Sequence, residues 1–146
     1  MPVPEPTPDD LEPDSRFPSG PWTGFFLQKI QPVGKHWMEL DLTFRKGRIT
    51  GEGRDRIGAF LMTGRYDVES GKCRWTKRYI EKHDIVYRGY NEGKGIWGTW
   101  EDPHAPWHRD GFHIWPVAMG DPTQQRLAEE AELPAPAEAE PVAVPG

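Results

Sequence analysis

Apolar and polar residues alternate with a period of two through most of the segment between residues 20 and 116. In residues 36–44 one set consists of Met38, Leu40, Leu42 and Phe44, and the other of Trp37, Glu39, Asp41 and Thr43. Successive side chains of a strand point to opposite faces, so one set faces a core and the other faces solvent. No helix-like period interrupts this pattern, which predicts an all-β domain.

Turn signals rich in Gly, Asn, Asp, Lys and Pro recur about every ten residues and divide the segment into eight strands. The predicted strands are one that begins near Trp22, followed by residues 36–44, 49–54, 57–66, 72–79, 84–90, 95–100 and 110–116. Short turns favour antiparallel pairing between consecutive strands, and an even number of such strands closes without leaving an edge. The sequence therefore predicts an eight-stranded antiparallel up-and-down β-barrel, with an open sandwich as the alternative.

The two ends of the chain differ in composition from the middle. Residues 1–18 are acidic and rich in Pro, which predicts a disordered leader, and residues 19–117 form the barrel domain. Residues 118–146 are predicted to contain a short helix over 122–133, with Asp121 as its N-cap, followed by a disordered tail rich in Pro, Ala and Glu.

Charge is distributed unevenly along the chain. The net charge is −5, but residues 1–19 and 117–146 together sum to −9, which leaves about +4 on the middle segment. One interpretation is that the charge serves solubility; the other is that the acidic ends cover a basic ligand face, or that the middle segment prefers anionic partners. Because an excess of four charges is small for a nucleic-acid-binding domain, we expect no nucleic acid as partner.

Compartment and redox chemistry follow from a few further observations. The chain has one cysteine, Cys73, so an intramolecular disulfide is excluded. Cys73 lies at a strand position, where a thiol is usually a small buried hydrophobe. The leader has no basic and apolar regions of a signal peptide, and no run is long enough to span a membrane. We therefore expect a cytoplasmic protein without a membrane partner.

The first strand opens with Gly20-Pro21-Trp22. This G-x-W resembles the start of strand one in the calycins, the up-and-down barrels that include lipocalins, avidins, fatty-acid-binding proteins and nitrobindin-like haem proteins. The resemblance implies an eight-stranded barrel in which Trp22 packs at the closed end against an Arg from near the last strand. Arg109 is the candidate for that arginine. The resemblance implies no particular ligand.

The segment 72–79 carries the residues with the most distinctive chemistry. Lys77 shares a strand face with Cys73, Trp75 and Tyr79, and this face is the more apolar one. If it faces the lumen, the ammonium needs a carboxylate or an anionic ligand, because burying it unpaired costs several kcal/mol. The carboxylates considered as partners are Glu52, Asp55 and Asp84. A lysine whose amine reaches the barrel mouth is the other interpretation.

These residues predict a non-catalytic binding module that recognises a small molecule or a short peptide in an aromatic-lined lumen. The predicted ligand-binding residues are Trp75, Lys77, Tyr79, Tyr87 and Trp100. A second hypothesis is a filled barrel that contacts another protein, including a second copy of the chain, through the outward Trp37 and Trp97. A third is an enzyme that uses Lys77 with a carboxylate.

Motifs for catalysis and for cofactors are missing. We find no nucleophile elbow, phosphate loop or zinc-protease motif, so we expect no cofactor and name no catalytic residue. His104, His108 and His113 lie close in sequence, but their spacing matches no common zinc signature, and we expect no metal site.

Overall fold

The computed structural model describes residues 10–124, so the predictions for residues 1–9 and 125–146 lie outside the described residues. The described chain forms eight strands and a short 3-10 helix, Val117–Met119. The strands are β1 (Gly20–Gln28), β2 (Gly34–Arg45), β3 (Arg48–Asp55), β4 (Ala59–Tyr66), β5 (Lys72–Tyr79), β6 (Asp84–Asn91), β7 (Ile96–Asp102) and β8 (Ala105–Pro116).

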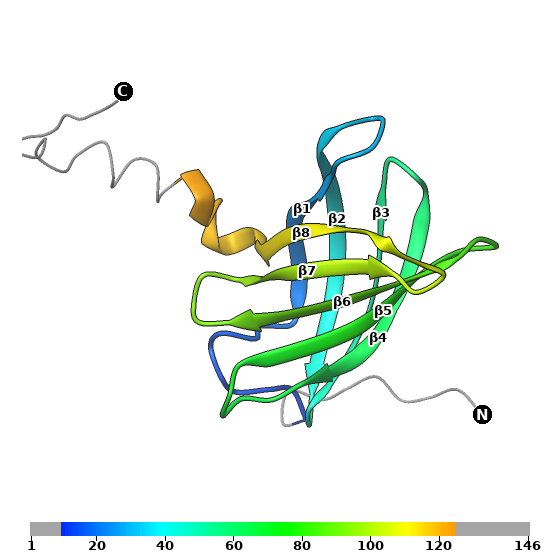
Figure 1. The fold of residues 1–146 in the computed structure, drawn as a ribbon. Coiled ribbons are helices and arrows are strands. Elements are labelled where there is room, and N and C mark those ends of the chain that lie inside the picture. Colours follow the sequence, from blue (N-terminus) through cyan, green and yellow to red (C-terminus); the bar gives the residue numbers. More distant parts are fainter. Residues whose placement is uncertain (1–9, 125–146) are drawn as a thin grey trace, which may run out of the picture.

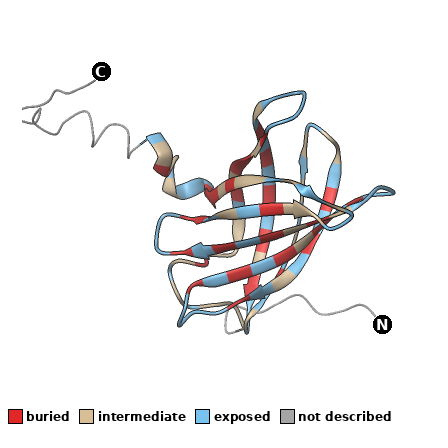
Figure 2. Cartoon of the chain, in the orientation of Figure 1, coloured by how far each residue is buried: buried red, intermediate tan, exposed pale blue. Residues whose placement is uncertain are grey.

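Each strand pairs antiparallel with the next along the chain, and β8 pairs with β1, which closes the barrel (Figure 1). The predicted all-β, eight-stranded up-and-down barrel is confirmed, and the sandwich alternative is excluded. Buried and exposed residues alternate along the strands, as Figure 2 shows. The alternation places one set of side chains in the lumen and leaves the other set on the outer face.

Side chains fill the lumen, as in the filled-barrel hypothesis, and a barrel of eight strands is just wide enough for this. Bulky rings fit because glycines face them on the neighbouring strand. Gly64 is paired with Trp75, and a Cβ on this glycine would lie 2.5 Å from the Trp75 Cβ. Gly53 is paired with Phe60, and its Cβ would lie 2.7 Å from the Phe60 ring. Gly53 and Gly64 therefore make room for aromatic rings on the neighbouring strand.

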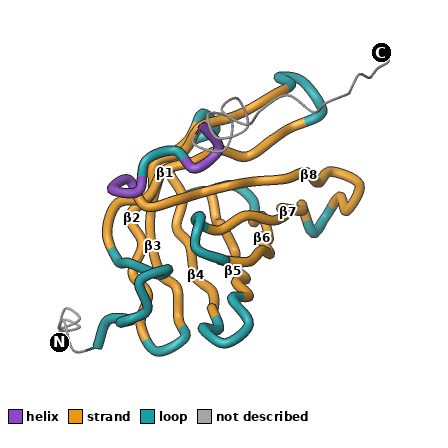
Figure 3. Tube along the Cα trace, turned by 90° about the vertical axis from the view of Figure 1, so that its left-hand side faces the viewer, coloured by secondary structure: helices purple, strands orange, loops and turns teal. Residues whose placement is uncertain are grey.

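Residues 10–19 close the end of the barrel opposite the β3–β4 turn (Figure 1 and Figure 3). Phe17 is fully buried and contacts Phe44 and Tyr66 at ring-centroid distances of 5.5 and 4.8 Å. The Asn91 side chain donates a 2.6 Å hydrogen bond to the Arg16 carbonyl. Residues 10–18 are thus packed against the barrel, contrary to the prediction of a disordered leader, because one aromatic ring anchors a segment that is otherwise polar.

The indole N–H of Trp22 donates a 2.8 Å hydrogen bond to the Pro18 carbonyl, and the ring is buried at the closed end, as the calycin resemblance implied. The prediction that Arg109 packs against it is wrong. Trp22 is paired with Pro116 of β8, whereas Arg109 is paired with Glu101 of β7, seven positions further back along the strand. Arg109 therefore lies near the other end of the barrel and is exposed.

The last strand begins at Ala105, five residues before the predicted start at Asp110. Only residues 112–116 of β8 pair with β1, so the first half of the strand has β7 as its one neighbour. Pro106 is tolerated there because its missing N–H removes no hydrogen bond from a second neighbour.

After β8 the chain passes through the 3-10 helix and begins a second helical turn at Pro122. Asp121 caps it as predicted, since its Oδ1 accepts hydrogen bonds from the backbone N–H groups of Thr123 (2.8 Å) and Gln124 (3.4 Å). The remainder of the predicted helix over 122–133 lies outside the described residues. Within residues 10–124, no helix has the length and apolar character needed to cross a membrane.

Candidate functional site

The ammonium of Lys77 is enclosed within the barrel, with 1 % of its side chain exposed. Its Nζ donates a 2.5 Å hydrogen bond to Oδ2 of Asp55 and a 3.3 Å hydrogen bond to the hydroxyl of Tyr87. The strand register is therefore the one in which Lys77, rather than its neighbours Thr76 and Arg78, points into the lumen. The buried charge has a carboxylate partner from the chain itself.

Four aromatic rings surround this ammonium. Its Nζ lies 4.3 Å from the ring centroid of Phe60, 4.8 Å from those of Phe26 and Tyr79, and 5.4 Å from that of Tyr87. These distances are within the range of cation–π attraction, which is strongest where water is excluded. The rings come from β1, β4, β5 and β6, so the charge holds together strands on opposite sides of the lumen.

The Asp55 side chain is fully buried and accepts three hydrogen bonds. Besides Lys77, the Tyr79 hydroxyl donates to Oδ2 at 2.6 Å and the Ile57 N–H donates to Oδ1 at 2.9 Å. Asp55 ends β3 at an inward position, which is why it reaches the lumen. Of the other two carboxylates considered, Glu52 faces outward and Asp84 accepts from Arg78 on the surface at 2.9 Å.

The structure brings all five predicted lumen residues into one cluster. The rings of Trp75 and Tyr87 stack at 5.4 Å, and both contact Phe112. Trp100 joins through Phe26 at 6.1 Å, and its indole N–H donates to the Leu27 carbonyl at 2.8 Å. Sequence reasoning did not include Phe26, Phe60 or Phe112, although each lies at an inward position of its strand.

Burial lowers the pKa of Lys77 to about 8, although Asp55 opposes this shift. Burial, together with the hydrogen bond to Asp55, raises the pKa of Tyr79, and burial raises the pKa of Tyr87 well above its ordinary value of 10.0. Burial also raises the pKa of the Cys73 thiol to about 12. The lumen therefore favours the neutral form of every one of these groups.

These shifts predict how stability depends on pH. Between about pH 8 and about pH 9 the folded chain has released the Lys77 proton while the unfolded chain, with the ordinary pKa of 10.5, retains it. Raising the pH therefore favours folding there, by about 1 kcal/mol. Above pH 9 the Cys73 thiol ionises in the unfolded chain, which cancels any further increase of stability with pH. Above pH 10 the tyrosines ionise in the unfolded chain, and stability falls.

Urea unfolding at about pH 7.5, 9 and 11 would measure this profile. The Lys77→Met variant is expected to lose the rise between the first two values and to keep the fall at the third. A wild-type stability that decreases from about pH 7.5 to 9 would contradict the placement of the ammonium.

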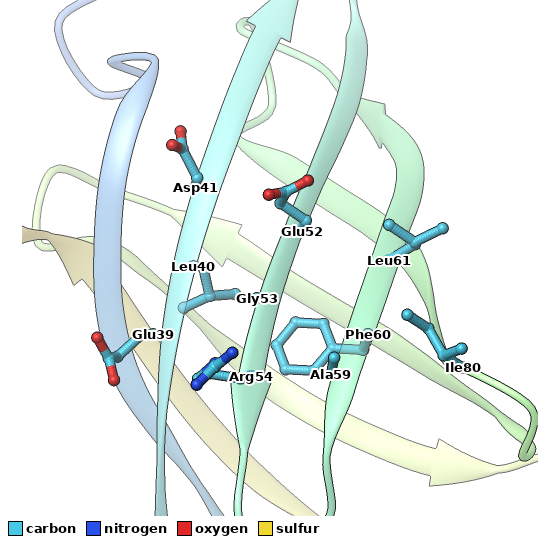
Figure 4. A pocket seen from close by; sticks show the side chains of 10 residues that line it. All are labelled: Glu39, Leu40, Asp41, Glu52, Gly53, Arg54, Ala59, Phe60, Leu61 and Ile80. Carbon is cyan, nitrogen blue, oxygen red and sulfur yellow. The ribbon is translucent and has the colours of Figure 1, made fainter.

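A shallow pocket of about 400 Å³ lies on the outside of β2, β3 and β4 (Figure 4). Its rim carries the carboxylates of Glu39, Asp41 and Glu52 together with Arg54, and its floor is the ring of Phe60 beneath Gly53. The same ring lies 4.3 Å from the Lys77 ammonium, measured to its centroid. The pocket is open to solvent and offers mixed charges, which gives it no clear preference for a ligand.

A different part of the outer face carries a line of positive charge. In register across five strands, Arg45 of β2 faces Arg48 of β3, which faces Arg65 of β4, then Arg74 of β5 and Arg88 of β6. We call these residues the arginine row. All five are exposed, and within residues 10–124 none of their guanidiniums forms a hydrogen bond or an ion pair.

A second row of identical residues separates these arginines from the nearest carboxylates of the same sheet. Thr43, Thr50, Thr63 and Thr76 face one another across β2 to β5. Beyond them lie Asp41 and Glu52, two rows from the arginines, which corresponds to about 13 Å along a strand. On β2 and β3 the threonine row thus keeps Arg45 and Arg48 apart from these two carboxylates.

A groove of about 700 Å³ runs over β4 to β7 at the arginine row. It is lined by Arg65, Tyr66, Asp67, Lys72, Cys73, Arg74, Arg88, Gly89, Tyr90, Trp97, Gly98 and Thr99. Four of these side chains are cationic and one, Asp67, is acidic; its carboxylate accepts a 2.7 Å hydrogen bond from the Ser70 hydroxyl in the β4–β5 turn. The groove thus combines positive charge with aromatic surface.

The three histidines predicted not to form a metal site are held apart by separate contacts. His104 lies in the β7–β8 turn, where its backbone N–H donates to Asp102, the His113 Nε2 lies 2.6 Å from the Lys94 carbonyl, and His108 stacks on Trp107 at 5.7 Å. Residues 10–124 contain no group of three or more acidic, His or Cys side chains that would hold a metal ion.

The fold and the lumen define the class of this protein as a closed eight-stranded up-and-down β-barrel with an ion pair in an aromatic core. Comparisons with protein-family models, with curated proteins and with solved structures found no match to the chain.

Proposed function

We propose that the protein is a non-catalytic binding module that takes an anionic ligand on its outer face, along the arginine row. The observation that carries the proposal is the register of five exposed arginines, each opposite the next and without a carboxylate partner in the described chain. Like charges directly opposite one another destabilise a sheet. An anionic ligand relieves this repulsion. Binding such a ligand therefore explains an arrangement that lowers the stability of the free barrel.

The lumen supports a second candidate, a small molecule or peptide held by Trp75, Lys77, Tyr79, Tyr87 and Trp100. The observation in its favour is that these side chains surround one buried ammonium. A ligand there must displace Asp55, which already accepts the Lys77 hydrogen bond, or part of the aromatic packing. A bound small molecule in native mass spectra of the full chain, lost on Lys77→Met, would favour this candidate over the outer face.

The central arginine of the row offers a test of the first candidate. Arg74 has an arginine on both sides, so Arg74→Gln is expected to raise the melting temperature of the free protein by a few degrees and to weaken binding of inorganic polyphosphate severalfold. The two effects have opposite signs, which a purely structural role would not produce. Calorimetry and titration at low salt measure them.

Arg54→Gln is the matched control, because Arg54 is an exposed arginine of β3 outside the row, opposite Glu39. It is expected to leave polyphosphate binding unchanged and not to raise the melting temperature. Equal effects of both substitutions on binding would reduce the arginine row to nonspecific surface charge and overturn the proposal.

The relationship to the calycins and the cytoplasmic location remain part of this proposal. The buried place of Trp22 at the closed end of the barrel supports the first. The single, buried thiol of Cys73 supports the second, since the fold uses no disulfide.

A further inference from the structure

Exposed aromatic rings lie directly beside the arginine row. Tyr90 follows Arg88 by two positions on β6, and Trp97 precedes Thr99 by two positions on β7, so both rings project from the same face as the arginines. Tyr90 and Trp97 are paired across the strands, with ring centroids 6.5 Å apart. They are 42 and 47 % exposed, and both line the groove.

The aromatic residues continue away from the groove in the same register. Trp97 is paired with His113 of β8, His113 with Phe25 of β1, and Phe25 with Trp37 of β2. We call Tyr90, Trp97, His113, Phe25 and Trp37 the aromatic row. On β6 and β7 it lies next to the positions of the arginine row, at a separation of about 7 Å along the strands.

Within the groove, the arginines and the rings of Tyr90 and Trp97 suit a chain that carries charge along one side and flat rings along the other. Arg65, Arg74 and Arg88 line the groove on three consecutive strands, and a strand spacing of about 4.8 Å places them over roughly 10 Å, which suits a short run of nucleotides. Guanidiniums bind phosphate oxygens in a bidentate manner, and the threonine row adds hydroxyl donors on the far side. Bases stack on aromatic side chains at about 1–3 kcal/mol each.

Other anionic partners fit this surface less well. A duplex keeps its base faces stacked inside, so it would use the arginines and leave Tyr90 and Trp97 without a role. A lipid surface is flat, whereas these rings line a groove. An acidic peptide, including the acidic ends of this chain, neutralises the arginines. It does not carry a planar ring beside each negative charge to stack on Tyr90 and Trp97.

We infer that the groove over β4 to β7 binds single-stranded nucleic acid, with the phosphates on Arg65, Arg74 and Arg88 of the arginine row and bases on Tyr90 and Trp97. This inference rests on the proposed function and names the ligand of the same face. It differs from what net charge alone suggested, because an excess of about four charges does not reveal that five arginines share one line.

The test uses the full chain and a fluorescent oligothymidylate of about twelve nucleotides, with anisotropy as the readout. Trp97→Ala and Tyr90→Ala are each expected to weaken binding about tenfold, the equivalent of about 1.4 kcal/mol, without changing the dependence of affinity on salt. Arg74→Gln is expected to reduce the slope of log K against log salt by about 0.7, the value for one phosphate of a single strand.

Trp107→Ala is the control, because Trp107 is a 74 % exposed tryptophan of β8 that does not line the groove. It is expected to bind the oligonucleotide like the wild type. Circular dichroism of each variant confirms that the barrel is folded.

Three outcomes would overturn the inference, and they separate it from the proposed function. If polyphosphate binds but neither aromatic substitution affects the oligonucleotide, the face is a general anion site and only the identity of the ligand fails. Tighter binding to the duplex, or to vesicles that contain phosphatidylserine, would likewise replace the single strand as ligand. If neither polyphosphate nor the oligonucleotide binds, the proposed function fails with the inference.

Discussion

Asp55→Ala is expected to destabilise the barrel by about 3–5 kcal/mol, the usual effect of removing one partner of a buried ion pair. The substitution leaves the Lys77 ammonium without its carboxylate in a site where 1 % of the side chain is exposed, and it removes the acceptor of the Tyr79 hydroxyl. The aromatic rings around Nζ attract the charge, but they do not replace the carboxylate that accepts its hydrogen bond. Urea unfolding at about pH 7 measures the difference.

Removal of the other partner of the ion pair, Lys77, is expected to have a smaller effect. In Lys77→Met the carboxylate keeps two donors, the Tyr79 hydroxyl and the Ile57 N–H, and methionine fills much of the lysine's volume. The double variant Lys77→Met/Asp55→Ala is therefore expected to be more stable than the sum of the two single effects predicts. Additive effects, or a loss below about 1 kcal/mol for Asp55→Ala, would show that the ion pair does not hold the lumen together.

Phe17→Ala is the second substitution with a large expected effect, also about 3–5 kcal/mol. The ring is fully buried at the closed end, where it contacts Phe44 and Tyr66, and its removal leaves a cavity between residues 10–19 and the barrel. Denaturant unfolding followed by tryptophan fluorescence measures the change. Trp22 is a convenient reporter, because its indole N–H is bonded to Pro18 of the same segment.

Ser15→Ala is the control for this substitution, since Ser15 is an exposed residue of the same segment. It is expected to change the free energy of unfolding by less than about 0.5 kcal/mol. If Phe17→Ala behaves like this control, the Phe17 ring does not stabilise the closed end, and the hydrogen bonds of residues 10–19 hold the segment without it.

The alternation of residues was enough to predict the strands and the orientation of β5. A face with Trp75, Lys77 and Tyr79 is more apolar than one with Arg74, Thr76 and Arg78, so burial selects it in spite of the charge. The same reasoning placed Tyr87 and Trp100 in the lumen. The sequence left three carboxylates as possible partners of Lys77. It could not identify Asp55 among them, because that depends on which strand end reaches the ammonium in the folded barrel.

Register explains most of what the sequence did not reveal. The arginine row joins residues as far apart as Arg45 and Arg88, and they line up only because each hairpin has a particular length. A shift of one residue in any hairpin would turn the neighbouring arginine toward the lumen. Phe17 was missed for another reason: it is a single ring in a Pro-rich segment with no periodicity, so nothing in the local pattern distinguishes it from a disordered leader.

The pairing of β1 with β8 has a consequence for the biosynthesis of the protein. This seam joins Trp22 to Pro116, so a nascent chain on the ribosome cannot complete the cylinder until the last strand has emerged. Until then both the first strand and the newest one offer unpaired backbone groups to other chains. We therefore expect closure of this seam to be a late step of folding, because its partners lie far apart in the sequence, and we expect a need for protection from self-association during translation.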